Sequence, residues 1–522
     1  MKLELVMKTA RSVTLRAMDG GIYTTKGSYK VILNGEEVMQ TKNVIFSLYH
    51  LKPAITYEVV LEEESSKEIH TICFTTDDEF ITLNVREMGA TGDGVTDDTS
   101  FIQAAISACP PRGRVLIPAG DYRIISLFLK SHTSIELQKG ARLIADTNPL
   151  VRPILPGMIE SYDEKEEYNL GTWEGNPLNM YAGVIHGMDV CDITIYGEGC
   201  IDGGASIENW WKNPKNILPA CRPRLIFLNR CSEIRMQGLQ LKNSPSWTVH
   251  PYFSTDLIFT DLTIRNPKDS PNTDGIDPES CSRVQIEGVH FDLGDDCIAI
   301  KSGKIYMGKT YHTPSQGIHI RQCLMENGHG AVTIGSEMAG GVKDVEVDSC
   351  YFHNTDRGLR IKTRRGRGEG GVIDDIVFQN VIMEEVLTPI VVNCFYFCDP
   401  DGRSDYVQSR ELHSVDERTP RIGKLKFEHI ICRDCHFAAV YVEGLPEQKI
   451  SEISLNDVHF TYAKDAKEGY PAMSLGVEKY SKYGCYLNNV RKVDMNEVTV
   501  EGCVGEPYHY IGVEEVNTNE QE

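Results

Sequence analysis

A short pattern recurs ten times through the 522-residue chain, and it limits the possible folds more than any other feature. Each copy is a polar residue followed by alternating β-forming residues and a turn, as in Asp192-Ile193-Thr194-Ile195. The steps between copies range from 23 residues, between Ile234 and Leu257, to 49 residues, between Ile376 and Leu425. Repeats with such periods indicate solenoids, propellers or arrays. The second residues of the ten copies are Ile193, Ile234, Leu257, Val284, Ile318, Val345, Ile376, Leu425, Ile453 and Val493.

The copies hold strands of only four or five residues and no long amphipathic helix, which disfavours propellers and helical solenoids. We therefore predict an all-β chain whose residues 81–522 form a right-handed parallel β-helix, with loops emerging from its coils near 145–190, 388–422 and 462–490. A helix from Thr99 to Cys109, capped by Asp side chains of the glycine-rich loop before it, would shield the first coil.

Residues 1–80 differ from the rest, because they alternate apolar and polar residues around an Asn34-Gly35 hairpin signal. This pattern predicts a small β-sandwich. The segment from Leu51 to Val59 resembles the corner that leads into a late strand of a fibronectin type III domain. A spacer or packing module and an independent sugar-binding module are both compatible with it.

Charge and hydropathy exclude several function classes. The chain has 53 Lys and Arg against 75 Asp and Glu, a net charge of −22, so its long-range field disfavours nucleic acids and anionic membranes. No stretch approaches a membrane span, and the N-terminus lacks the apolar run of an export signal. We expect a cytoplasmic protein whose 16 cysteines are reduced thiols, although a chain trimmed of its signal would look the same.

Four short motifs between residues 270 and 362 carry the candidate chemistry. Asn272-Thr273-Asp274 precedes Gly294-Asp295-Asp296 by one coil, and Gly328-His329-Gly330 and Arg360-Ile361-Lys362 follow at about one looped coil each. Neighbouring strands of a parallel stack lie about 4.8 Å apart, so side chains one coil apart meet on one face. The spacing therefore gathers three carboxylates, one histidine and two cations.

Three clustered carboxylates repel one another, so at least one pKa rises and that group can act as a general acid, while an ionised partner activates water. Adjacent Asp295 and Asp296 can both serve one site only if the backbone bends at Gly294. Taken singly, each Asp motif is also compatible with a capped turn or a calcium loop.

A run of cations follows, with Arg364, Arg365 and Arg367 close behind Arg360 and Lys362. In so acidic a chain, the run is either a solvated basic loop or a local anion site. We predict an anion site, and we expect no metal and no cofactor.

The four motifs resemble those of the polygalacturonases of glycoside hydrolase family 28, which are right-handed parallel β-helices. The resemblance implies hydrolysis of α-1,4-galacturonosidic bonds with inversion, with Asp295 as the acid and with Asp274 and Asp296 activating water. His329 would orient or tune the acid. The residues implied to bind substrate are Asn272, Arg360, Lys362, Tyr396 and Glu337.

The N-terminal module and the Ile334–Met338 segment resemble the bacterial exo-acting subgroup, which favours release of galacturonic acid from oligogalacturonide or homogalacturonan. Trp173, Trp210 and Trp211 would either wall off the cleft or pack in the core. The alternatives are an endo-polygalacturonase, a rhamnogalacturonan or xylogalacturonan hydrolase, a calcium-dependent pectate lyase, and a non-catalytic galacturonan-binding β-helix.

Overall fold

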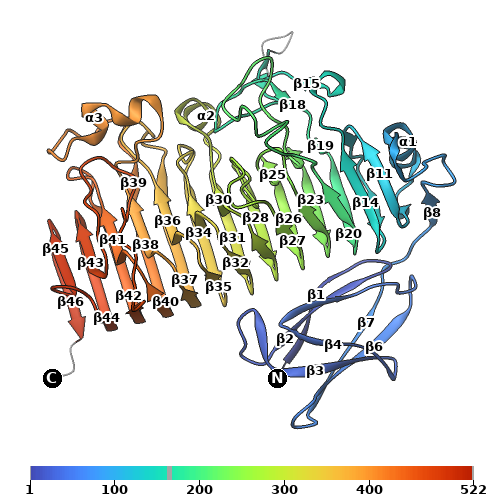
Figure 1. Cartoon of the computed structure of the whole chain (residues 1–522), viewed down its shortest axis with the longest axis horizontal. Helices are drawn as coiled ribbons and strands as arrows, with labels where there is room; N and C mark the ends of the chain where they lie inside the picture. The colour runs from blue at the N-terminus through green and yellow to red at the C-terminus, as the bar shows by residue number, and fades with distance from the viewer. Residues whose placement is uncertain (1, 161–166, 520–522) are drawn as a thin grey trace.

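The computed structural model describes residues 2–160 and 167–519 and consists almost entirely of β-strands (Figure 1). The N-terminal module holds two antiparallel sheets, with strand orders β1-β2-β5 and β4-β3-β6-β7. Asn34 and Gly35 make the predicted hairpin turn between β3 and β4, both with positive φ. The strands of the module are β1 (Lys2–Lys8), β2 (Val13–Met18), β3 (Thr24–Leu33), β4 (Glu36–Asn43), β5 (Ile45–Leu48), β6 (Thr56–Glu63) and β7 (Ile69–Thr75).

From residue 81 onward the strands that form the coils pair in parallel with the coil before and the coil after, so the predicted parallel β-helix is confirmed. A 24-stranded sheet forms two sides of each coil. Its strands are β8 (Ile81–Asn84), β9 (Asp93–Asp97), β10 (Gly113–Ile117), β11 (Gly120–Ile124), β13 (Thr133–Leu137), β14 (Ala141–Ala145), β20 (Cys191–Gly197), β21 (Cys200–Asp202), β23 (Ser232–Gln237), β24 (Gln240–Lys242), β26 (Thr255–Thr260), β27 (Thr263–Arg265), β28 (Ser282–Glu287), β29 (His290–Asp292), β31 (Ser315–Arg321), β32 (Leu324–Glu326), β34 (Val342–Asp348), β35 (Tyr351–His353), β37 (Val372–Glu384), β39 (Arg421–Ile422), β40 (Lys424–Cys435), β42 (Ile450–Tyr462), β44 (Val490–Glu501) and β46 (Glu515–Asn519).

Two further parallel sheets form the remaining side of the coils and carry the candidate site. The first holds β12 (Leu127–Phe128), β19 (Ile185–Met188), β22 (Ile226–Asn229) and β25 (Val249–Tyr252). The second holds β30 (Asp296–Ile300), β33 (Gly330–Ile334), β36 (Arg357–Lys362), β38 (Thr388–Asn393), β41 (Ala438–Glu443), β43 (Tyr483–Asn488) and β45 (Tyr508–Ile511).

The sequence repeat corresponds to the register of the coils. The second residue of each copy pairs with the second residue of the next copy, from Ile193 with Ile234 through to Ile453 with Val493. All ten of these residues are buried in the core. The residue at the head of a copy has a left-handed backbone in the first seven copies, as at Asp192 with φ 54° and Asp256 with φ 58°. Five of these seven residues are Asp or Gly, which tolerate this conformation better than most residues.

Helix α1 (Thr99–Ala108) lies at the N-terminal end of the solenoid (Figure 1) and buries Ile102, Ala105 and Ile106. Asp97 accepts a hydrogen bond from the Thr99 N–H (3.0 Å), as capping predicted. Asp98 does not cap the helix, because its carboxylate instead accepts the N–H groups of Thr91 and Gly92. It therefore ties the glycine-rich loop back to the start of α1.

The N-terminal module packs against turns of the solenoid (Figure 1). A Cβ on Gly238 would lie 1.8 Å from the Tyr49 hydroxyl, so the tyrosine occupies space that only glycine leaves open. Ser12 donates to Gln237 (2.6 Å), and Arg16 pairs with Glu287 (3.4 Å). The fibronectin type III likeness and the domain boundary at residue 80 stay predictions.

Long loops project from one edge of the solenoid (Figure 1). Three occupy the predicted regions, but strands take up part of each region. The first loop ends at residue 184, before β19, the second begins at residue 394, after β38, and the third ends at residue 482, before β43. The elements in the loops are η1 (Pro149–Val151), β15 (Ile154–Leu155), β16 (Ile159–Glu160), β17 (Glu167–Tyr168), β18 (Met180–Tyr181), α2 (Ile305–Tyr311), η2 (Pro400–Arg403) and α3 (Asp405–Gln408).

All 16 cysteines are free thiols, and most are buried, which agrees with the packing role expected for them. Among the described residues, no helix has the length and apolar character needed to cross a membrane.

Candidate active site

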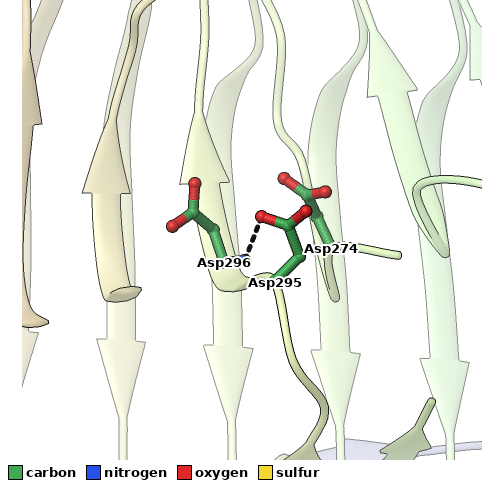
Figure 2. Close-up of side chains that lie close together, drawn as sticks. All are labelled: Asp274, Asp295 and Asp296. Carbon is green, nitrogen blue, oxygen red and sulfur yellow. Dashed lines mark hydrogen bonds between the residues drawn. The ribbon is translucent and has the colours of Figure 1, made fainter. Parts of the chain in front are cut away.

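Asp274, Asp295 and Asp296 meet on one face of the solenoid, as the motif spacing predicts (Figure 2). One carboxylate oxygen from each lies within 4.8 Å of the other two. Asp296 is the first residue of β30, Asp295 belongs to the turn before it, and Asp274 lies one coil earlier. The Asp296 N–H donates to an Asp295 carboxylate oxygen (3.0 Å), so the two neighbours brace each other.

Gly294 allows the bend that brings both adjacent aspartates to the site. A Cβ on this residue would lie 1.7 Å from the Lys268 carbonyl oxygen, a contact no other residue could make. Because Asp295 precedes the strand, it escapes the alternation that would send it to the opposite face. The predicted bend is therefore confirmed.

Asp296 is held by two cations on β36, which confirms that Arg360 and Lys362 share its face of the sheet. Its carboxylate accepts from Arg360 Nη1 (3.1 Å), Lys362 Nζ (2.9 Å) and Thr333 Oγ1 (2.8 Å). Burial alone would raise the pKa of Asp296, but Lys362 and Arg360 outweigh it and hold that pKa well below its ordinary value. Asp296 is thus ionised and suited to act as a base.

The pKa of Asp274 is shifted in the opposite direction to that of Asp296. Burial, followed by the neighbouring Asp295 and Asp277, raises its pKa well above the ordinary value. The clustering of carboxylates was expected to raise at least one pKa, and the raised pKa of Asp274 agrees with this expectation.

Lys301 compensates this buried acidity and was missed in the sequence. Its Nζ lies 3.9 Å from Asp274, 3.8 Å from Asp277 and 3.8 Å from Glu337, and 4.3 Å from the centre of the Trp247 ring. Its neighbouring carboxylates raise the pKa of Lys301 despite burial, so the ammonium stays charged. The signal was a lone lysine directly after the apolar run Cys297–Ile300.

His329 lies beside the carboxylates at the start of β33. Its N–H donates to the Asp295 carbonyl oxygen (2.9 Å), and its Nδ1 lies 2.5 Å from a carboxylate oxygen of Asp356. A Cβ on Gly330 would lie 2.7 Å from the Asp296 carboxylate, so glycine beside the histidine permits the close approach that the motif predicts. Asp356 is a second residue that the sequence reasoning missed.

Arg360 and Lys362 also line a small pocket with Asn393 and Tyr396, and residues 471–473 close it. Lys362 Nζ lies 5.7 Å from the centre of the Tyr396 ring. Two further predicted contact residues lie near the carboxylates. Asn272 accepts from Arg222 Nη2 (2.7 Å), and Glu337 is buried near Lys301.

The predicted five-cation anion site is wrong in part. Arg364 pairs with Asp399 (3.0 Å), Arg365 with Glu447 (2.6 Å) and Arg367 with Asp399 (2.6 Å), and all three arginines are buried. These cations are thus neutralised within the fold, where they fix the loop after β38. Only Arg360 and Lys362 of the run face the carboxylates.

Trp173 and Trp210 both pack in the interior, as the core alternative predicts. Trp173 is buried, lies parallel to Trp247 with ring centres 6.3 Å apart, and packs under Arg224. The next residues of its loop reach the site, because a Cβ on Gly175 would lie 2.9 Å from the Glu337 side chain. Trp210 is buried and contacts Tyr181 edge to face, so it belongs to the packing of the loops.

Comparison with known proteins decides the family. The model of "Glycosyl hydrolases family 28" matches residues 161–472, and a rhamnogalacturonase A/epimerase, pectate lyase-like model matches residues 82–144. A probable polygalacturonase of Vitis vinifera is 31% identical over 394 residues, which cover 73% of this chain and 74% of the relative. The chain is a polygalacturonase of glycosyl hydrolase family 28.

Solved structures agree with this assignment. The family 28 exopolygalacturonase of Yersinia enterocolitica, at 19% identity, matches with a TM-score of 0.73 over 99% of this chain and 98% of its own, so the likeness in fold includes the N-terminal module. The exopolygalacturonase of Thermotoga maritima is 26% identical, with a TM-score of 0.61 over 77% of this chain and 94% of its own.

In this polygalacturonase, the carboxylates have charge partners within the protein. Three clustered aspartates are of the type that binds divalent cations. Here Arg360 and Lys362 already pair with Asp296, and Lys301 lies beside Asp274. The expectation that no metal takes part stays a prediction.

Proposed function

We propose that this polygalacturonase is exo-acting and releases galacturonic acid from the end of oligogalacturonides or homogalacturonan, with inversion at the anomeric carbon. The observation that carries the proposal is that a loop approaches the site on each side of the three carboxylates. The loop between β14 and β19 comes from the N-terminal side, and the loop between β42 and β43 comes from the C-terminal side (Figure 1).

On the N-terminal side, the loop brings Glu174 and Gly175 to the site. The backbone N–H of Lys304 donates to the Gly175 carbonyl (3.0 Å), and Lys304 Nζ lies 4.0 Å from Glu174. Lys304 also pairs with Asp399 (2.9 Å), which belongs to the loop after β38. Ion pairs therefore join two loops at this end, which suits a pocket closed beyond a few sugars.

On the C-terminal side, the loop is tied to β36. Arg357 donates to the carbonyl oxygens of Pro471 (2.9 Å) and Tyr470 (2.7 Å), and Met473 Sδ lies 2.7 Å from Arg360 Nη2. The segment therefore lies directly beside the residues that would bind the substrate carboxylate. The exopolygalacturonase name of the Thermotoga maritima structure also favours this mode of action.

The roles in hydrolysis follow the family resemblance and the charges at the site. Asp295 gives a proton to the leaving glycosidic oxygen, and ionised Asp296 takes a proton from the water that attacks the anomeric carbon. Asp274 helps to hold this water, and because its own pKa is raised, Asp296 is the proton acceptor of the two. Arg360 and Lys362 pair with a galacturonate carboxylate, while Tyr396, Asn272 and Glu337 contact the sugars. His329 tunes the acid with its imidazole, and its backbone N–H, which donates to the Asp295 carbonyl oxygen, keeps the ring beside that residue.

Inversion rests on the family, because the spacing of carboxylates does not select it. The nearest oxygens lie within 4.8 Å, whereas the carboxyl groups of inverting enzymes are usually about 6.5–9.5 Å apart. The anomer released from trigalacturonate, followed by proton NMR in the first minutes, tests the point directly. Initial formation of the retained anomer would overturn inversion and leave the exo proposal intact.

Digestion of polygalacturonate tests the exo mode. We expect monomer from the first minutes with nearly unchanged viscosity, and an Asp295→Asn variant serves as the inactive control. A ladder of mixed oligomers with a rapid fall in viscosity would establish endo cleavage instead. Products that absorb ultraviolet light would identify a lyase. Binding of polygalacturonate without new reducing ends would identify a non-catalytic protein. A preference for rhamnogalacturonan would identify a rhamnogalacturonan hydrolase.

A further inference from the structure

The contacts of His329 assign a role to Asp356, a residue outside the four motifs. We infer that Asp356 is a positioning residue, which fixes the His329 imidazole with its Nδ1–H on the Asp356 carboxylate and its Nε2 available to the substrate. The inference rests on the role proposed for His329. It names a further residue of the catalytic arrangement.

The two residues are joined by backbone as well as side chain. The Asp356 N–H donates to the Gly328 carbonyl oxygen (2.8 Å), directly before His329, and the His329 Nδ1 contact follows from this pairing. Arg357 Nη1 (2.7 Å) and the Thr388 N–H (3.1 Å) donate to the Asp356 carbonyl oxygen. The Asp356 backbone is therefore held by two neighbouring coils and by the adjacent Arg357, and this places its carboxylate against the ring.

A histidine whose Nδ1 donates to a carboxylate has its tautomer set by that bond, and Nε2 becomes the free ring nitrogen. Among the described residues, Nε2 of His329 has no protein hydrogen-bond partner, and more than a third of the side chain is exposed. The ring is thus open to solvent on the side away from Asp356, beside the backbone of Asp295.

The charged groups around the pair come from two coils. Asp295 and Asp296 approach His329 from the preceding coil, and Arg357 and Arg360 lie near Asp356 on β36. Burial alone would raise the pKa of Asp356, but its hydrogen bond with His329 and then the charges of Arg357 and Arg360 lower it. The carboxylate is therefore ionised and accepts from Nδ1–H.

The test compares Asp356→Asn, Asp356→Ala and His329→Ala on trigalacturonate. We expect each Asp356 variant to lower kcat about 10- to 100-fold with little change in KM, the scale for removing a group that orients a functional histidine. Asp457→Asn is the matched control, because Asp457 also accepts from a histidine, His429 (2.7 Å), but lies on another sheet. Unchanged kcat in both Asp356 variants would overturn the inference.

A double-variant cycle separates positioning from a structural role. If Asp356 acts through His329, Asp356→Asn has no further effect on kcat in the His329→Ala background. Full additivity of the two losses would overturn the inference. If His329→Ala alone keeps full activity while cleavage still requires Asp295, the role proposed for His329 fails, and the inference fails with it.

A spectroscopic readout needs no activity. In protein labelled with ¹⁵N-histidine, the His329 signal is assigned by its loss in His329→Ala, and its nitrogen shifts report which ring nitrogen bears the proton. We expect the Nδ1–H form in the parent protein and a changed signal in Asp356→Ala. An Nε2–H form in the parent protein would overturn the inference.

Discussion

Replacing Lys362 by Met tests whether cations keep Asp296 ionised. Lys362 Nζ lies 2.9 Å from the buried Asp296 carboxylate, where two unit charges attract by about 6 kcal/mol at an effective dielectric constant of about 20. Arg360 remains as a partner in the variant, so the whole of this energy is not lost. A single neighbouring cation typically lowers a carboxyl pKa by about 1–3 units.

In the variant, the pKa of Asp296 therefore rises, and the carboxylate is protonated at a higher pH than in the parent. We expect the acid limb of the kcat/KM profile on trigalacturonate to move up by about 1–3 pH units. Loss of substrate binding alone would lower kcat/KM at every pH and leave the limb in place. The position of the limb thus separates the two roles of Lys362.

Two controls complete the experiment. Lys362→Arg keeps the cation and should keep the limb of the parent protein. Lys426→Met removes a lysine paired with Glu428 (2.9 Å) on β40 and should change nothing. If Lys362→Met and Lys362→Arg have the same acid limb, the electrostatic reasoning is refuted.

Three further variants test other parts of the structure. Arg365→Leu leaves Glu447 buried without its partner and should lower the free energy of unfolding by about 3–5 kcal/mol in urea titrations, whereas a change below about 0.5 kcal/mol would contradict burial of the pair. Burial raises the pKa of Glu279 to about 8, so between about pH 4.5 and pH 8 the folded carboxyl keeps a proton that the unfolded one has lost. The free energy of unfolding should therefore fall as pH rises through that range. Glu279→Gln should remove this slope, and equal slopes in the two proteins would disprove the reasoning. Gly238→Ala should destabilise by about 1–3 kcal/mol more than Gly476→Ala, because both have φ near +80° but only the first new Cβ meets Tyr49; equal thermal shifts would argue against close docking of the module.

The repeat made the fold predictable, because each coil uses the same register. The residue after each polar head packs inward in every copy, so the ten positions could be aligned from the sequence alone. The lengths of the loops were predictable for the same reason, as excess residues between copies. Their conformations were not, since Trp173 packs under Arg224 through contacts that no local pattern encodes.

The carboxylates, His329, Arg360 and Lys362 were predictable from one-coil spacing. Asp356 and Lys301 were missed because each belongs to the site only through a neighbour in another coil, which the local sequence around a single charged residue does not identify. Arg365 was misread for a related reason. Its partner Glu447 lies 82 residues away, so a run of cations looked unpaired until the loops were placed.

The docking of the N-terminal module has a consequence for how the solenoid comes apart. In a stack of coils, each coil touches only its neighbours, so opening can spread from an end one coil at a time. The module joins separate coils, since His50 contacts Glu198 (3.1 Å), Ser12 contacts Gln237 and Arg16 contacts Glu287. Strands β20 to β29 are thereby linked into one cooperative unit. Their amide hydrogens should exchange together and more slowly than those of β43 to β46. Asp295 follows β29 and so lies at the edge of that unit.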